Sequence, residues 1–172
     1  MDQQFCGGNC EIGAIKGELM KANQKNLLLW MVPGCLILIL DRAFKMLFHD
    51  ADIVLLPGVL ALTGAQNTGM AMGMMEDNPV LLVILSVVLI GVSIYFLKEY
   101  RIKGLAAVSI SMIAGGAVGN AIDRIFIGYV IDMIEVLFID FYIFNVADIG
   151  VVCGAVLCGI SLLFCPKEWE KK

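Results

Sequence analysis

Four long apolar segments dominate the pattern of hydrophobic and polar positions along this chain. They cover about residues 27–48, 79–97, 104–122 and 145–164. An α-helix rises 1.5 Å per residue, so each segment is long enough to cross about 30 Å of hydrocarbon. The pattern predicts an all-α membrane protein, built as a bundle of four transmembrane helices.

Two segments between these spans have a different pattern. Residues 53–56 and 59–63 are short β-like runs on either side of Pro57 and Gly58, which form a turn signal. We therefore expect a small extramembrane sheet, or β-cradle. Residues 125–144 are apolar but interrupted by a glycine and three acidic residues. That composition suits a segment lying in the membrane interface better than another crossing.

Composition agrees with a membrane protein. Of 172 residues, 60% are hydrophobic and 16% are charged, and the mean hydropathy is +0.89. Soluble domains have about 45–50% apolar and about 25% charged residues. The net charge of −4 is too small and too scattered to suggest a nucleic-acid partner. The length fits one compact domain, over residues 27–172, after a tail.

The tail, residues 1–26, is polar and mixed in charge, and we expect it to be solvated, with a short helix over residues 12–21. Cys6 and Cys10 could hold a metal ion, but no second pair and no histidine accompanies them. We therefore expect no metal site and no cofactor. No signal peptide is expected either, because the first long apolar run begins only at Leu27.

The basic residues indicate how the chain is oriented. Nine of the twelve lie in the tail, in the loop after the second span and at the C-terminus, three in each place. Segments 49–78 and 125–144 contain none. Because cytoplasmic loops are rich in Lys and Arg, both termini are expected in the cytoplasm and these two segments outside.

Polar residues interrupt three spans at one depth. Counted from the cytoplasmic ends, Asp41, Asn120 and Asp148 lie about 21–24 Å up three different helices. A charge that faces lipid at the bilayer centre costs about 2.5–3.5 kcal/mol. We therefore expect a single polar site in the outer leaflet, open toward the extracytoplasmic surface.

Residue spacing shows which polar side chains share a helix face. Asn120, Asp123 and Arg124 are three or four positions apart, as are Asn145 and Asp148, so each set lines one face.

The first span adds a pair of its own. Asp41 and Lys45 are four apart, in the order that favours an ion pair, whereas Arg42 is expected to reach toward the interface as a snorkelling cation.

Carboxylates are the remaining candidates for chemistry at this site. The single histidine, His49, lies outside the polar cluster, so no Ser-His-Asp or Cys-His set is available, and there is no zinc or phosphate-loop motif. If Asp132 and Asp148 meet, repulsion and partial desolvation raise one pKa and leave one acid protonated. Such a pair can activate water for peptide hydrolysis. Spacing alone makes this plausible without making it specific.

Four motifs resemble those of a known family. GGAVGNAIDRIFIGYVIDMI, followed by FNVADIGVVCGA, resembles the paired C-terminal signatures of lipoprotein signal peptidase (signal peptidase II). DRAFK resembles that family's first-span motif, and NTGMAM resembles its N-x-G-x-A motif. The four occur in the family's order over residues 27–165.

The resemblance implies a four-span bundle with an extracytoplasmic β-cradle and an interfacial helix before the last span, in the bacterial cell membrane. It implies an aspartic endopeptidase that cuts diacylglyceryl-modified prolipoproteins just before the lipidated cysteine. The implied partners are lipid-modified signal peptides, membrane lipids and globomycin-type inhibitors. No nucleic acid and no cofactor is expected, and the chain is expected to be a monomer.

By motif position, the resemblance implies that Asp132 and Asp148 are the catalytic pair. The residues that would position the substrate or brace the site are Asn67, Gly69, Asn120, Arg124, Asn145, Asp123, Asp41 and Lys45. The chain departs from the family at four positions, which bear on substrate preference and inhibitor fit: Arg42 for the usual Gln, Phe44 for Ser or Thr, and Met72 and Met133 for aromatic residues.

Two other functions remain open at this point. The departures also fit an inactive paralogue that binds lipidated peptides. Buried carboxylates are also characteristic of small proton-coupled membrane transporters, although four spans without an internal repeat count against one.

Overall fold

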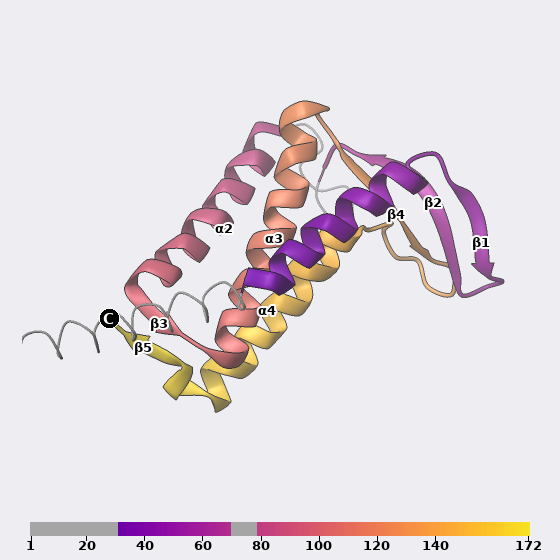
Figure 1. The fold of residues 1–172 in the computed structure, drawn as a ribbon. Coiled ribbons are helices and arrows are strands. Elements are labelled where there is room, and N and C mark those ends of the chain that lie inside the picture. Colours follow the sequence, from indigo (N-terminus) through magenta and orange to yellow (C-terminus); the bar gives the residue numbers. More distant parts are fainter. Residues whose placement is uncertain (1–30, 70–78) are drawn as a thin grey trace, which may run out of the picture.

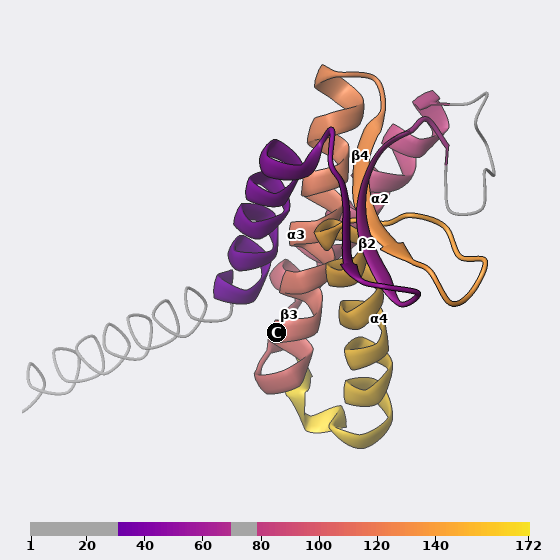
Figure 2. The same cartoon turned by 90° about the vertical axis from the view of Figure 1, so that its right-hand side faces the viewer.

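The computed structural model describes residues 31–69 and 79–172. Within them, the long helices are one over residues 31–48, α2 (Pro79–Glu99), α3 (Gly104–Phe126) and α4 (Val146–Phe164), and α3 packs against each of the other three. Figures 1 and 2 show α3 between helix 31–48 and α2. The predicted tail helix, the cysteine pair of the tail and Met72 lie outside the described residues.

Three described helices are long and apolar enough to cross a membrane, namely α2, α3 and α4. Two of them run further than predicted, because α2 ends at Glu99 and α3 at Phe126. Helix 31–48 is interrupted by three charged residues, and the start of its predicted span lies outside the described residues. The molecule is therefore a membrane protein whose described part is mostly helical.

Small residues let α3 approach its neighbours closely. A Cβ on Gly115 would overlap the backbone oxygen of Gly34 in helix 31–48, and one on Gly116 would overlap the backbone oxygen of Ala147 in α4. Close backbone approach at small residues is how membrane helices gain packing energy without a hydrophobic driving force between them. This contact brings the polar residues of three helices within reach of one another.

The predicted β-hairpin is present as β1 (Asp52–Leu56) and β2 (Leu60–Asn67). Gly58 adopts φ 70°, a conformation that glycine adopts without steric cost, in the turn between them. A third strand, β4 (Val130–Val136), pairs with β2, and the antiparallel order is β1-β2-β4. The sheet lies at the end of the bundle opposite the C-terminus (Figure 1).

The prediction of an interfacial helix before the last span is wrong. Residues 127–145 contain β4 and a turn, and no helix. Gly128, with φ 85°, lets the chain turn at the end of α3. The residues that follow are rich in Val and Ile, which favour a strand when a partner edge such as β2 is available.

A second small sheet closes the other end of the bundle. It pairs β3 (Tyr100–Ile102) with β5 (Trp169–Lys171), which follows the short helix η2 (Pro166–Glu168). A compact apolar cluster lies beside it, formed by Ile102, Ala106, Ala107 and Ile110. The C-terminus is thus fastened to the loop that joins α2 and α3.

Candidate active site

The two aspartates come from different elements, one from a strand of the sheet and the other from a helix. Asp132 is on β4 and is buried, and Asp148 is in the first turn of α4. Asn145 caps that helix: its Oδ1 accepts from the Asp148 N–H at 2.9 Å, and its own N–H donates to Asp148 Oδ2 at 3.2 Å. This reciprocal capping box fixes the Asp148 carboxylate relative to the start of the helix.

Two buried amides connect the two carboxylates. Asn145 Nδ2 donates to Asp132 Oδ1 at 2.5 Å and to Asn120 Oδ1 at 3.1 Å. Asn120 Nδ2 in turn donates to Asp148 Oδ1 at 2.7 Å. Asp132 and Asp148 therefore belong to one hydrogen-bonded network, although 16 positions separate them in the sequence.

The end of β2 supplies the second oxygen of Asp132 with a donor. Asn67 Nδ2 donates to Asp132 Oδ2 at 2.7 Å, and Asn67 Oδ1 accepts from the Gly69 N–H at 2.9 Å. Arg124 Nη2 donates to the Gly69 carbonyl at 3.0 Å. This chain of bonds ties α3 to the strand end that faces Asp132.

A charged cluster braces the site from the side of helix 31–48. Lys45 Nζ lies 3.0 Å from Asp41 Oδ2 and 2.8 Å from Asp123 Oδ2, and all three side chains are at most 3% exposed. The same ammonium donates to Asn120 Oδ1 at 3.0 Å. Asp41 Oδ1 accepts from the Ala147 N–H at 3.0 Å, at the N-terminus of α4, where the helix dipole favours a negative charge.

Arg42 belongs to this cluster, so the prediction that it snorkels is wrong. Its Nη1 lies 2.6 Å from Asp123 Oδ1, and its Nη2 lies 2.8 Å from Asp41 Oδ2 and 3.0 Å from the Gly119 carbonyl. Two acids thus face two bases, and a paired cluster avoids the cost of an isolated buried charge. The i,i+4 rule identified the Asp41–Lys45 pair, but no local rule showed that α3 brings a second carboxylate to Arg42.

The environment of Asp132 favours its protonated form. Burial, opposed by the hydrogen bond from Asn67, combines with the negative charge of Asp148 to raise the pKa of Asp132 to about 6. The hydrogen bond from Asn145 lowers the pKa, because a donor stabilises the ionised carboxylate. Asp132 therefore keeps its proton to a higher pH than a free aspartic acid does.

A cavity of about 240 Å³ opens beside this network. Its polar wall includes Asp148, Asn120, Arg124 and Asn67, and its other wall is apolar, with three leucines of α2. Tyr142 also lines it, although no motif or spacing in the sequence singled out this residue. A lining that combines polar and apolar side chains suits a substrate with a peptide part and an apolar part.

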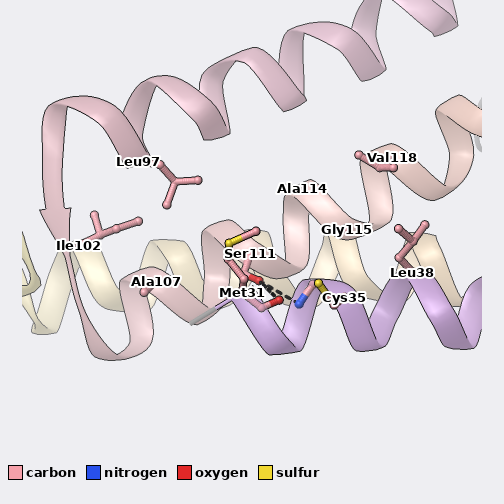
Figure 3. A pocket seen from close by; sticks show the side chains of 11 residues that line it. Met31, Cys35, Leu38, Leu97, Ile102, Ala107, Ser111, Ala114, Gly115 and Val118 are labelled. Atoms are coloured by element: carbon pink, nitrogen blue, oxygen red, sulfur yellow. Dashed lines mark hydrogen bonds between the residues drawn. The ribbon is translucent and has the colours of Figure 1, made fainter. Parts of the chain in front are cut away.

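A second cavity, of about 210 Å³, lies between helix 31–48, α3 and the end of α2 (Figure 3). Its lining is apolar apart from Ser111, whose hydroxyl accepts from the Gly34 N–H. Its one titratable side chain is the Cys35 thiol, and no carboxylate, histidine or lysine lines the cavity to act with it as an acid or a base.

The remaining candidate groups lie elsewhere. His49 is 56% exposed and lies 2.8 Å from Asp50, outside the network, as the sequence predicted. Within residues 31–69 and 79–172, no three His, Cys, Asp or Glu side chains come together as metal ligands. The chemistry that the described residues offer is therefore that of two carboxylates, their amide donors and water.

Comparisons with known proteins show the family to which this chain belongs. The family described as "Signal peptidase (SPase) II" matches residues 34–164. A "Lipoprotein signal peptidase" of Lactobacillus johnsonii is 36% identical over 146 residues, which cover 81% of this chain and 95% of the relative. One from Streptococcus thermophilus is 42% identical over 103 residues, which cover 59% of this chain and 67% of the relative.

Solved structures share the fold. Two described as a "bacterial membrane enzyme" superpose on this chain with TM-scores of 0.70 and 0.67, at 27% and 26% sequence identity. The first match covers 78% of this chain and 87% of the other, and the second covers 79% and 93%.

Proposed function

Because this chain belongs to the signal peptidase II family, we propose that it removes signal peptides from diacylglyceryl-modified prolipoproteins by aspartic catalysis. The observation that supports this most is the bridge between the two carboxylates. Asn145 and Asn120 hold Asp132 and Asp148 in one network, and Asp148 lines the cavity beside it. A pair held in this way can share the proton that acid–base hydrolysis needs.

In the proposed reaction, Asp132 carries the proton and Asp148 is ionised. Asp148 takes a proton from a water molecule whose oxygen attacks the carbonyl carbon of the scissile peptide bond, while Asp132 gives its proton to the carbonyl oxygen. The tetrahedral intermediate then returns that proton to Asp132 and re-forms the carbonyl. The C–N bond breaks, and the leaving amine takes the proton held by Asp148.

The other residues of the network have supporting roles in this proposal. Asn67, Asn120 and Asn145 orient the carboxylates, because each donates to one of them. Arg124 and Gly69 hold the strand end through their hydrogen bond, and Arg124 also lines the cavity. The cluster of Asp41, Lys45 and Asp123, joined by Arg42, fixes helix 31–48 against α3.

We place this reaction at the extracytoplasmic side of the bacterial cell membrane. Four spans, with helix 31–48 as part of the first, put both termini in the cytoplasm and the sheet β1-β2-β4 outside as a cradle. The distribution of basic residues supports this orientation. Residues 27–172 form the peptidase domain, and residues 1–26 form a cytoplasmic tail.

The lining of the cavity supports the proposed peptide partner. The apolar wall from α2, with Leu82, Leu85 and Leu89, suits the apolar part of a signal peptide and the acyl chains of the modified cysteine. Membrane lipids surround the exposed apolar side chains of the helices. Globomycin-type inhibitors should compete for the same cavity, and the chain is proposed to act as a monomer.

The test is cleavage by purified protein in detergent. We expect it to shorten a diacylglyceryl-modified precursor by its signal peptide, and to leave a matched precursor with Ser at the modified position intact. Globomycin should block the first reaction. Binding of the lipidated precursor without cleavage would identify an inactive paralogue, and cleavage of both precursors would contradict the proposed specificity. Proton flux in liposomes without cleavage would favour a transporter.

A further inference from the structure

Tyr142 is held next to the candidate site but has no part in the mechanism above. It lies in the segment between β4 and α4 and is half-buried. Its ring stacks on Phe141, with centroids 4.2 Å apart and planes at 30°, and meets Phe144 edge-on at 6.3 Å. This aromatic packing restricts where the phenol can point.

The backbone of this segment is fixed to the strand that carries Asp132. The Phe144 N–H donates to the Ile134 carbonyl at 3.0 Å, and the Ile134 N–H donates to the Phe144 carbonyl at 2.8 Å. Phe144 is thereby paired with the residue two positions beyond Asp132. Tyr142 is thus positioned by the same strand as the aspartate.

The Tyr142 side chain lines the cavity that also contains Asp148, Asn67 and Arg124. Burial and the negative charges of Asp148 and Asp132 raise the pKa of the Tyr142 phenol above its usual value. The hydroxyl therefore keeps its proton over the whole pH range in which a carboxylate pair works. It is a neutral hydrogen-bond donor at the edge of the site.

A substrate in this cavity has a specific need for such a donor. A peptide that is extended for cleavage has given up its helical hydrogen bonds, and in a membrane no bulk water replaces them. Each carbonyl left without a donor costs free energy. Ser86, another hydroxyl of the cavity wall, already donates to the Leu82 carbonyl of its own helix.

We propose that the Tyr142 hydroxyl donates a hydrogen bond to a backbone carbonyl oxygen of the substrate, next to the scissile bond, and so positions the extended peptide beside Asp148. The inference rests on the proposed peptidase function. The bond forms when the substrate binds and persists in the transition state. It therefore contributes to substrate affinity and leaves the chemical step unchanged.

The test compares Tyr142→Phe, Tyr142→Leu and the control Tyr129→Phe in cleavage of the diacylglyceryl-modified precursor. Tyr142→Phe keeps the ring packing and removes the hydroxyl, and Tyr129 is not among the residues that line the cavity. Loss of one neutral hydrogen bond in Tyr142→Phe should raise KM about threefold to tenfold and leave kcat within about twofold of the wild type. Tyr129→Phe should match the wild type. Tyr142→Leu should lose at least as much affinity as Tyr142→Phe.

Two further readouts separate positioning from a structural effect. The pH profile of kcat/KM should keep its midpoint in Tyr142→Phe, because the carboxylates are unchanged. In the inactive Asp148→Asn background, Tyr142→Phe should weaken binding of a labelled precursor by the same factor.

Three results would overturn the proposal. These are an unchanged KM in Tyr142→Phe, a loss confined to kcat, or a shifted pH midpoint. Failure of the wild type to cleave the precursor would instead refute the peptidase function itself.

Discussion

Asn145 offers a sharp test of how the site is held, because its side chain has two separable tasks. Its Oδ1 caps α4 by accepting from the Asp148 N–H, and its Nδ2 donates to Asp132. The side chain is completely buried, so water cannot replace either bond without rearrangement. We compare Asn145→Ser, which keeps a capping oxygen but lacks the amide nitrogen, with Asn145→Ala, which keeps neither.

The expected magnitudes follow from these bonds. Loss of a cap costs about 0.5–2 kcal/mol, and loss of a partner for a buried polar group costs about 1–3 kcal/mol. Asn145→Ser should therefore lose about 1–3 kcal/mol and Asn145→Ala about 1.5–5 kcal/mol. Thermal unfolding in detergent should rank the wild type first, the serine variant second and the alanine variant last.

The same variants should change the pH dependence of cleavage. The Asn145 donor lowers the pKa of Asp132, so its removal raises that pKa above about 6. Because Asp132 is proposed to act in its protonated form, the alkaline limb of kcat/KM should move to higher pH in both variants, with a lower maximum. Equal melting temperatures for the two variants would refute the capping role. A limb that does not move would refute the contact with Asp132.

Three further outcomes follow from the structure. In the wild type, kcat/KM should fall as pH rises through about 6, where Asp132 loses its proton, and a profile still rising above pH 7 would contradict the assignment of the proton. Arg42→Gln should destabilise the protein by about 1–3 kcal/mol. Lys103→Gln, which breaks the exposed ion pair with Glu170, should cost about 0–1 kcal/mol. Equal melting temperatures for these two variants would count against the charged cluster. Gly119→Ala places a Cβ 2.9 Å from a buried carboxylate oxygen and should destabilise the protein by about 1–3 kcal/mol. Gly159→Ala, with open space around it, should be neutral or stabilising by up to about 1 kcal/mol. The reverse order of the two melting temperatures would show that the helix packing is wrong.

The part of the fold that local patterns determine could be predicted from the sequence. Runs of apolar residues located the helices to within a few positions, and Pro57-Gly58 located the first hairpin. Strand β4 was missed because it forms only by pairing with β2, which lies about 70 positions earlier in the sequence. Without that pairing, a short apolar segment with scattered acidic residues is as compatible with an interfacial segment as with a strand.

The candidate site shows the same division. The common depth of Asp41, Asn120 and Asp148 predicted one polar cluster, and their side chains do belong to one connected network. The position of Asp132 in it came from the family resemblance, because no periodicity relates a strand residue to a helix cap. The position of Arg42 in the charged cluster depends on packing between helix 31–48 and α3, which the pattern of one segment alone cannot predict.

The most direct test of the central claim is cleavage of the diacylglyceryl-modified precursor by Asp132→Asn and Asp148→Asn, with Asp140→Asn as the control. All three changes replace a carboxylate by an amide of similar shape, and Asp140 is exposed in the turn after β4. We expect the first two variants to bind the precursor without cutting it and the control to cut at the wild-type rate. Cleavage by either Asp132→Asn or Asp148→Asn at the wild-type rate would contradict catalysis by this pair.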